Sequence, residues 1–266
     1  MNQHKENGRA AWLRPSARCL ARPQARGSVW RLVLLGAPGV GKGTQAGLLS
    51  ERLGTCHLST GDVFRAARSS AKPPSPAMAA ALDCMRQGKL VPDQTVWEMV
   101  RERIGCLRCL GGFVLDGFPR TLAQADSLRQ LMDKECLELD AVVNYVLPLS
   151  EIIKRLSGRR ACAVCNAVFH LTNQPPKQDG VCDHCGGRLY QRDDDRSGSI
   201  AVRLQAYERS TEPLIQFYRN LGRLTVILAS GSPEEIFART VTALGEQRKQ
   251  GKIRPEYNLS KLTPYT

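Results

Sequence analysis

The residues with the clearest chemical potential form the glycine-rich segment Gly36-Ala37-Pro38-Gly39-Val40-Gly41-Lys42-Gly43-Thr44. Glycines let the backbone wrap a phosphate chain with its N–H groups, and the positive end of a following helix attracts the anion. Lys42 is expected to reach the β and γ phosphate oxygens, and Thr44 to place a hydroxyl near Mg²⁺. The general pattern has Ser or Thr directly after the lysine, whereas Gly43 intervenes here. The segment predicts a nucleoside triphosphate site, and a tight turn without function is the alternative.

A second signal is a short apolar run that ends in Asp116 and Gly117. In a phosphate-loop protein, a metal-orienting aspartate stands at this place, at the carboxyl edge of the sheet. No second acid adjoins Asp116 to activate water, and transfer to an acceptor that is already anionic needs no base. The pattern favours a kinase acting on a phosphate over a hydrolase. A helix-capping or turn aspartate is the alternative for Asp116 taken alone.

Six arginines surround these segments and a small predicted insert. Any one of them alone fits a solvated surface residue. Together, on both sides of an insert, they are expected to move onto phosphates when the insert closes, supplying positive charge and excluding water. They are Arg65, Arg120, Arg155, Arg159, Arg192 and Arg203.

Four of the ten cysteines form the pattern Cys162-x₂-Cys165-x₁₆-Cys182-x₂-Cys185. Two such pairs can present four thiolates tetrahedrally, which is the chemistry of a structural zinc site and points to a reducing compartment such as the cytoplasm. A redox pair and a nucleic-acid-reading zinc ribbon are the alternatives. His170 and His184 are expected to be ordinary polar residues. The Cys106-x₂-Cys109 pair is interpreted as two ordinary thiols at a helix end, with weak metal or redox chemistry as the alternative.

The elements that must position these residues alternate between strands and helices. Nearly continuous apolar runs predict strands at residues 29–35 and 113–116, and further strands are predicted at 55–59, 141–147 and 224–228, with helical patterns between them. The alternation predicts a doubly wound parallel α/β sheet. Apolar residues at helical spacing predict a long helix over 199–221, bent near Pro213. Two stretches interrupt the alternation: residues 60–91 are helical with a proline-rich break, and residues 157–191 hold the paired cysteines.

Composition and charge narrow the function classes further. The 266 residues are 42% hydrophobic and 24% charged, which excludes wholesale disorder and collagen-like repeats. The formal net charge is +13, of which residues 1–30 carry +5 and residues 246–266 carry +3. The modest balance of the middle argues against a dedicated nucleic-acid binder but allows an anionic substrate. No run of 18 apolar residues exists, so no membrane partner is expected.

The basic N-terminal stretch is expected to be a disordered extension or the product of a translation start placed too early. An organelle-targeting presequence, suggested by arginines at 14, 18, 22 and 26 with almost no acid, is the alternative.

Several segments, taken together, cover residues 30–245 and resemble one family closely. They are Gly36-Ala37-Pro38-Gly39-Val40-Gly41-Lys42-Gly43-Thr44-Gln45, Ser59-Thr60-Gly61-Asp62, Gly88-Lys89-Leu90-Val91-Pro92-Asp93, Asp116-Gly117-Phe118-Pro119-Arg120-Thr121, Arg155-Leu156-Ser157-Gly158-Arg159-Arg160, the four cysteines, and Gln191-Arg192-Asp193-Asp194-Asp195. They are similar to adenylate kinases of the long-lid, zinc-bearing bacterial type. The resemblance implies the reaction MgATP + AMP ⇌ 2 ADP. It also implies a P-loop fold with a five-stranded parallel sheet, helices on both faces, a helical flap for the monophosphate and a zinc-ribbon lid.

The resemblance assigns roles residue by residue. ATP binding falls to Gly39, Val40, Gly41, Lys42, Gly43, Thr44, Arg155 and Arg159, with Arg155 against the adenine. AMP binding falls to Thr60, Arg65, Val91, Gly117, Arg120, Gln124, Arg192 and Arg203, with Gln124 reading the base edge. Catalysis falls to Lys42, Asp116, Arg120, Arg159, Arg192 and Arg203. Thr44 and Asp116 hold Mg²⁺ largely through water, the four cysteines hold zinc, and Asp194 and Asp195 match lid carboxylates.

The resemblance also divides the chain and exposes two departures. The expected divisions are a disordered basic extension (1–28), core (29–59), flap (60–91), core (92–156), lid (157–191), core (192–246) and basic tail (247–266). The family's Gly-Thr-x-Leu-Gly stretch is replaced by residues 69–76 with their prolines, and the segment 229–233 is one residue shorter than usual near the adenine of ATP.

The expected partners are ATP and AMP, with no nucleic acid, and the protein is expected to be a monomer. Two alternatives remain. One is a P-loop kinase for CMP, UMP or another small acceptor, and the other is a zinc-ribbon nucleic-acid-binding protein with a vestigial nucleotide site.

Overall fold

Five parallel strands form the main sheet of the computed structural model, which describes residues 29–68, 76–109 and 111–249. The strands are β1 (Trp30–Gly36), β2 (Cys56–Ser59), β3 (Gly112–Asp116), β4 (Ala141–Val146) and β8 (Leu224–Leu228). Their order is β2-β3-β1-β4-β8, and every neighbouring pair is parallel. The five predicted strands are confirmed, with ends displaced by at most one residue. The predicted doubly wound α/β class is confirmed with them.

Helices cover both faces of this sheet. Successive side chains of the central strand β1 point to opposite faces and are apolar on both, so both faces must be buried. Val33 and Leu35 join one apolar core, and Leu32 and Leu34 join the other. The first core is completed by α4 (Thr60–Arg68), α5 (Pro76–Arg86), α6 (Asp93–Arg101), α7 (Ile104–Leu107), α8 (Leu122–Lys134) and α11 (Pro213–Asn220). The second is completed by α3 (Lys42–Leu53), α9 (Leu149–Ser157), α10 (Ser197–Ala206) and α12 (Pro233–Lys249). Each fully buried leucine stabilises the fold by roughly 1.5–3 kcal/mol.

The predicted long helix near the C-terminal end of the described chain is interrupted where expected. After α10, a π-helical turn occupies Tyr207–Thr211 (η2), with the backbone N–H of Glu212 donating to the carbonyl of Tyr207 at 2.9 Å. Pro213 then begins α11 at the first helical position, where its missing N–H costs nothing. The wider turn accommodates the proline ring that a continuous α-helix would exclude.

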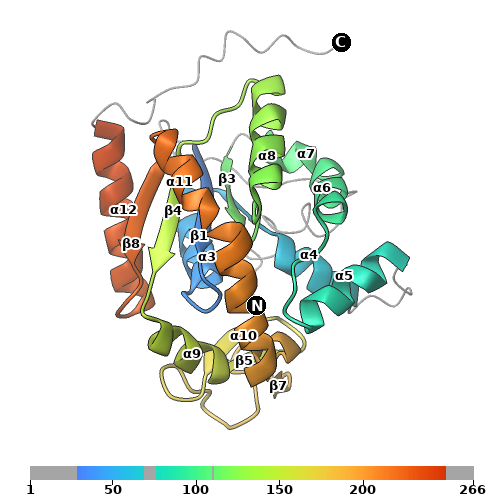
Figure 1. Cartoon of the computed structure of the whole chain (residues 1–266). Helices are drawn as coiled ribbons and strands as arrows, with labels where there is room; N and C mark the ends of the chain where they lie inside the picture. The colour runs from blue at the N-terminus through green and yellow to red at the C-terminus, as the bar shows by residue number, and fades with distance from the viewer. Residues whose placement is uncertain (1–28, 69–75, 110, 250–266) are drawn as a thin grey trace.

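Two insertions lie at the carboxyl edge of the main sheet (Figure 1). The helical insertion contains α4 and α5, and the cysteine-bearing insertion contains β5 (Arg159–Cys162), β6 (Val168–His170) and β7 (Leu189–Tyr190). The last three strands form a separate antiparallel sheet of order β6-β5-β7, with a small core of its own. A 3₁₀ turn at Asp193–Asp195 (η1) returns the chain to α10. We call the helical insertion the flap and the cysteine-bearing insertion the lid.

Some sequence-based expectations fall outside the described residues. These are the basic extension at 1–28, most of the proline-rich break at 69–75, and residues 250–266 of the basic tail. None of the described helices combines the length and apolar character needed to cross a membrane.

The cysteine pair before β3 lies in the interior of the protein. Cys106 and Cys109 are both buried in the first core, and Cys109 Sγ is 3.4 Å from Cys56 Sγ. The pair is therefore remote from the four cysteines of the lid in the chain and belongs to a different apolar core.

Candidate active site

The glycine-rich segment forms a loop between β1 and α3, as the sequence predicts. Gly36 has φ +131°, and a Cβ there would lie 2.4 Å from the carbonyl oxygen of Tyr145, so a side chain is excluded. Gly41 has φ +98° and caps α3, which begins at Lys42. The helix therefore presents its unpaired N–H groups and positive dipole end towards the loop. Thr44 lies exposed in the first turn of α3.

Lys42 folds back over this loop. Its Nζ donates to the carbonyls of Gly36 at 2.7 Å and Ala37 at 2.9 Å. Burial, together with the positive charge of the nearby Arg120, lowers the pKa of Lys42 to about 7, against the opposing charge of Asp116. An ammonium held among carbonyls and like charges is ready to exchange these contacts for anionic oxygens.

Asp116 ends β3 beside the same loop. It is in register with Ser59, the last residue of β2, and with Leu34, two residues before the end of β1. A Cβ on Gly43 would lie 3.5 Å from Asp116 Oδ2, which brings the aspartate to the first turn of α3. Desolvation acts to raise the pKa of Asp116, but a hydrogen bond from His57 and the charges of His57 and Lys42 hold it at about 2. The carboxylate is thus an ionised oxygen ligand at neutral pH.

The predicted arginines from the lid and from α10 meet on two carboxylates. Arg159 Nε donates to Asp195 Oδ2 at 2.7 Å, and Arg203 Nη1 donates to Asp195 Oδ1 at 2.8 Å. Asp195 is completely buried, and Arg203 also lies 3.1 Å from Asp194 Oδ2. Burial acts to raise the pKa of Asp194, but Arg203 and Arg159 lower it. The two aspartates therefore hold these guanidinium groups in place.

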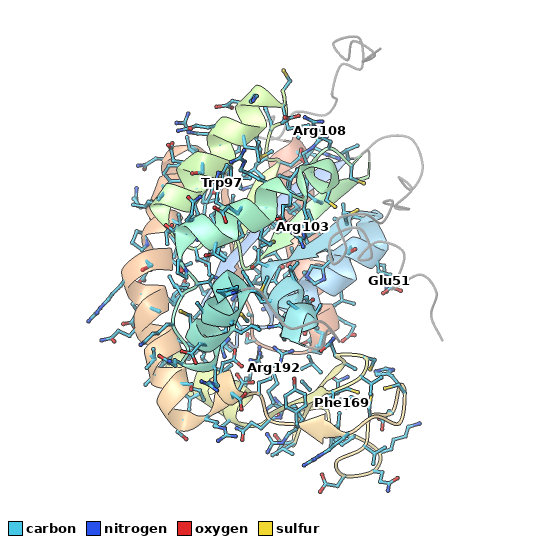
Figure 2. All side chains as sticks on the ribbon, turned by 90° about the vertical axis from the view of Figure 1, so that its right-hand side faces the viewer. Glu51, Trp97, Arg103, Arg108, Phe169 and Arg192 are labelled. Carbon is cyan, nitrogen blue, oxygen red and sulfur yellow. The ribbon has the colours of Figure 1, made fainter. Side chains whose placement is uncertain are left out.

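The remaining arginines extend this positive field. Burial, together with the charges of Arg65 and Arg159, lowers the pKa of Arg192 to about 10. Figure 2 shows Arg192 at the junction between the lid, which carries Phe169, and the rest of the molecule. Burial and the charges of Arg203 and Arg65 lower the pKa of Arg120. Arginines from the flap, the segment after β3, the lid and α10 therefore lie close together. Such a field is built to receive several negative charges.

Arg155 occupies a different side of the loop. It donates from Nη2 to the carbonyl of Ala229 at 2.9 Å and from Nη1 to that of Val40 at 3.5 Å. The guanidinium therefore bridges the glycine-rich loop and the segment after β8.

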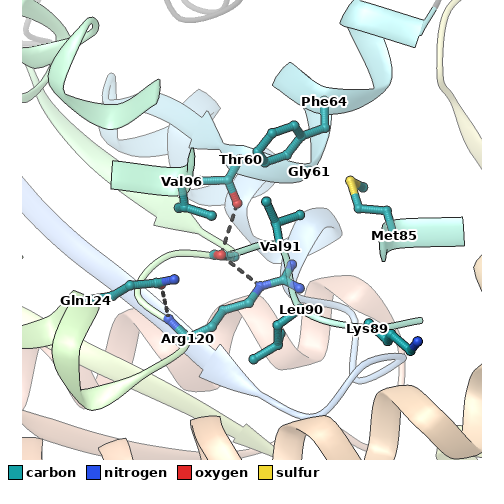
Figure 3. A pocket seen from close by; sticks show the side chains of 11 residues that line it. Thr60, Gly61, Phe64, Met85, Lys89, Leu90, Val91, Val96, Arg120 and Gln124 are labelled. Carbon is teal, nitrogen blue, oxygen red and sulfur yellow. Dashed lines mark hydrogen bonds between the residues drawn. The ribbon is translucent and has the colours of Figure 1, made fainter. Parts of the chain in front are cut away.

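A pocket lies between the flap and the ends of β2 and β3 (Figure 3). The Thr60 hydroxyl donates to the carbonyl of Gly117 at 3.0 Å, and Arg120 Nε donates to the same carbonyl at 2.8 Å. Gln124 accepts from the backbone N–H of Arg120 at 2.8 Å. Of the residues assigned to AMP, the pocket is lined by Thr60, Val91, Gly117, Arg120 and Gln124. It is also lined by Gly61, Phe64, Met85, Lys89, Leu90 and Val96.

Arg65 does not line this pocket but stands beside it on α4, paired with Asp62. Burial acts to lower its pKa, while Asp62 raises it by charge and by hydrogen bonding, with a net increase. Arg192 and Arg203 likewise lie outside the lining and join the arginine cluster between lid and core.

The four cysteines of the lid come together as the spacing predicts. Their Sγ atoms all lie within 4.8 Å of one another, with 3.4 Å between Cys162 and Cys185 and 3.6 Å between Cys165 and Cys182. Ligands about 2.3 Å from a tetrahedral zinc ion lie about 3.8 Å apart, so the donor set and spacing fit this metal. Desolvation acts to raise the pKa of Cys162, but backbone N–H groups of Cys165 and Val164 lower it to about 7. Burial instead raises the pKa of Cys165 to about 12, so the four thiols differ in how readily they ionise.

The two lid histidines stand outside this group. His170 Nδ1 accepts from the backbone N–H groups of Thr172 and Asn173, both at 3.1 Å. The His184 ring packs against Phe169, with centroids 5.8 Å apart. Four sulfurs fill a tetrahedron without them.

Two polar residues of the site have no role in the sequence-based assignment. His57 lies on β2, with Nε2 3.5 Å from Asp116 Oδ2. Asp93 lies at the start of α6 and contacts Gln124. The order of strands in the sheet, which places β2 beside β3, is the signal that would have found His57.

Sequence comparisons agree with this geometry. A family model described as "Adenylate kinase" matches residues 34–223. The adenylate kinase of Carboxydothermus hydrogenoformans is 46% identical over 214 residues, which cover 80% of this chain and 99% of the relative. That of Caldicellulosiruptor saccharolyticus is 43% identical over 215 residues, covering 81% and 99%. That of Streptomyces avermitilis is 45% identical over 215 residues, covering 80% and 96%.

Proposed function

Because the chain belongs to the adenylate kinase family, we propose how its residues divide the work of that reaction. The activity is reversible transfer of the terminal phosphoryl group of MgATP to AMP, giving two ADP. The observation that carries the division of roles is the meeting of Lys42, Asp116 and the converging arginines at one edge of the sheet. The alternatives of a different acceptor and of a nucleic-acid-binding protein gain no support from the comparisons.

On the ATP side, the amides of residues 39–44 and the Lys42 ammonium bind the triphosphate. Support comes from the left-handed Gly41, the helix start at Lys42 and the lysine's position over the loop. Arg155 packs against the adenine, supported by its bridge between Val40 and Ala229.

Arg159 contacts the phosphoryl group that moves. Its fixed pairing with Asp195 means that little reorganisation is needed when charge develops there.

On the AMP side, the pocket beneath the flap binds the nucleoside and the neighbouring arginines bind its phosphate. Thr60, Val91 and Gly117 line the wall, and Gln124 reads the base edge. Arg65 and Arg120 hold the phosphate at the pocket mouth. Arg192 and Arg203 span the gap towards the ATP phosphates, supported by the mutual influence of their charges with Arg65 and Arg120.

The transfer itself uses alignment and electrostatics with no covalent intermediate. The acceptor oxygen belongs to a phosphate and is already anionic, so no side chain must remove a proton from it. Closing the lid and the flap brings the arginine cluster onto both nucleotides and excludes water, which would otherwise hydrolyse ATP. Phe169 and the lid cysteines serve this step indirectly by keeping the lid folded.

Magnesium and zinc fit two separate donor sets. Mg²⁺ prefers oxygen ligands and retains waters, and the Asp116 carboxylate with the Thr44 hydroxyl supplies such oxygens. When bound, Mg²⁺ neutralises charge on the ATP phosphates. The four lid sulfurs provide a closed tetrahedral set for a structural Zn²⁺.

We further propose that residues 60–91 and 157–191 act as the flap and the lid, on a core formed by residues 29–59, 92–156 and 192–246. The separate sheet and separate apolar core of the lid support this division. Four reduced cysteines support a cytoplasmic location. The monomeric state stays a prediction, and light scattering of the purified protein tests it.

A panel of acceptors tests the proposal. ADP formation from MgATP should be fastest with AMP and slower with CMP, UMP and IMP, because Gln124 is matched to the adenine edge. Equal rates with all four would contradict the assignment of the pocket. A faster rate with CMP or UMP would identify a kinase for another monophosphate.

A Lys42→Ala variant tests the phosphate loop. Removing a principal transition-state charge should lower turnover by roughly 10³-fold or more. The variant should melt at a temperature no lower than that of the parent, since the Lys42 ammonium donates to two loop carbonyls, those of Gly36 and Ala37. Turnover close to that of the parent would contradict the role of Lys42.

A further inference from the structure

Asp93 connects the flap side of the molecule to the start of α8. It is the first residue of α6, and its Oδ2 accepts from the Thr121 hydroxyl at 2.8 Å. Its Oδ1 accepts from Gln124 Nε2 at 2.7 Å. Thr121 caps α8 by accepting from the Gln124 backbone N–H at 3.1 Å. Asp93 does not line the pocket itself and has no role in the division proposed above.

The Gln124 side-chain amide is consequently held in one of its two orientations. Its Oε1 accepts from the backbone N–H of Arg120, a group that can only donate. Its Nε2 donates to the Asp93 carboxylate, a group that can only accept when ionised. Rotating the amide by 180° would set N–H against N–H and oxygen against oxygen. Gln124 is also 96% buried, so water cannot compensate either contact.

This orientation leaves Gln124 with one N–H and one oxygen lone pair for a ligand. Adenine presents an acceptor at N1 and a donor at its 6-amino group, which is the complementary pair. Hypoxanthine presents the reverse, a donor at N1 and an acceptor at O6. The opposite orientation of the same amide would therefore recognise IMP in place of AMP.

We propose that Asp93 is a specificity-determining positioning residue, which selects 6-aminopurine monophosphates by fixing the orientation of the Gln124 amide. The inference rests on the proposed role of Gln124 in reading the base. Asp93 acts without touching the nucleotide, through one hydrogen bond to Gln124 and through the capped start of α8. Without it, only the Arg120 N–H opposes the rotated amide.

The test compares AMP and IMP as acceptors for the full chain and for Asp93→Ala. Losing one of two orienting hydrogen bonds should narrow the ratio of kcat/KM for AMP over IMP by roughly three- to tenfold. The KM for ATP should not change, because Asp93 lies on the acceptor side. A merely structural role would weaken both acceptors together and leave their ratio intact. An unchanged ratio overturns the proposal.

Three further variants sharpen this test. Glu234→Ala is the matched control, since Glu234 is an exposed acid in the first turn of α12 and its removal should leave the ratio unchanged. Asp93→Asn should restore most of the ratio, because its carbonyl can accept from Gln124 and its amide can donate to Thr121. Asp93→Ser replaces the alanine variant if alanine fails to fold, since its short hydroxyl cannot span both partners.

Gln124→Leu separates this inference from the proposed function. If Gln124→Leu leaves the preference for AMP unaltered, the base is read elsewhere and the role of Gln124 fails. If Gln124→Leu abolishes the preference while Asp93→Ala and Asp93→Ser leave it intact, the role of Gln124 stands and that of Asp93 is wrong.

Discussion

The pKa of Lys42 depends on two opposing influences, burial among other positive charges and the nearby carboxylate of Asp116. Burial and the like charges of Arg120, Arg203 and Arg159 lower its pKa from 10.5 to about 7, against the favourable charge of Asp116. The unfolded chain therefore binds this proton more tightly than the folded chain. The contribution of Lys42 to the free energy of unfolding is unfavourable below pH 7 and improves as the pH rises from about 7 to 10.5.

This shift predicts proton uptake when ATP binds. At pH 8 Lys42 is largely neutral in the free protein. When the negatively charged phosphates of ATP bind, they should raise the pKa of Lys42, so that its amino group takes up a proton. Calorimetric titration with MgATP in buffers of different ionisation enthalpy measures the uptake. It should fall as the pH is lowered towards 6, where Lys42 is already charged. Lys42→Ala should lack this component, and equal uptake by parent and variant would contradict the origin in Lys42.

Individual residues differ in how far the sequence determines their place. The sequence predicts Lys42, Asp116 and the four lid cysteines because each belongs to a short contiguous pattern. His57 and Asp93 could not be predicted, since their partners Asp116 and Gln124 lie on other elements and become neighbours only through strand order and helix packing.

At the scale of elements, the lid depends on its cysteines more than on apolar packing. Its buried core consists of Cys162, Phe169, Cys182 and Leu189, too few residues to stabilise three short strands alone. Strands β1 and β3 could be predicted to within one residue because they are nearly continuous apolar runs, and β2, β4 and β8 because helical patterns separate them. The strands of the lid could not be predicted from apolar patterns, because they are short, with only two residues in β7. Their positions depend on the turns that hold the cysteines.

The lid should therefore contain zinc and lose order without it. Metal analysis of purified protein is expected to give about one zinc per chain. Removing it with a chelator should lower the melting temperature and the turnover, because Arg159 begins β5 of the lid. Cys162→Ser should do the same, whereas Cys136→Ser, at an exposed cysteine of the core, should not. Full turnover after complete zinc removal would contradict this dependence.

At the scale of the whole molecule, the site and both main cores lie between residues 29 and 249. Arg248 closes this unit by stacking over Trp30, 3.9 Å from the ring centroid, and by donating to the carbonyl of Val29 at 3.2 Å. Much of the net charge of +13 belongs to residues outside this unit. The positions of the arginines around the site therefore say more about catalysis than the total net charge of the chain.

Removing residues 1–28 and 250–266 should leave turnover with AMP within about twofold of the full chain, because all proposed site residues remain. Assays of ADP formation and thermal melting at matched protein concentrations measure this. A shorter version that also lacks residues 245–249 should melt at a lower temperature, since the Arg248 contacts to Trp30 and Val29 are lost. A tenfold loss of turnover in the first version would show that the terminal segments take part.

The pairing of β5 with β7 also has a meaning for protein engineering. Ala161 lies opposite Tyr190 and Cys162 opposite Leu189. The two chain segments that connect the four-cysteine part of the lid to the rest of the protein are therefore neighbouring strands, about 4.8 Å apart. A different small domain whose chain ends lie close together is expected to replace this part of the lid and leave Arg159 and Arg192 near each other. Turnover of such chimeras reads out directly whether a grafted domain has folded.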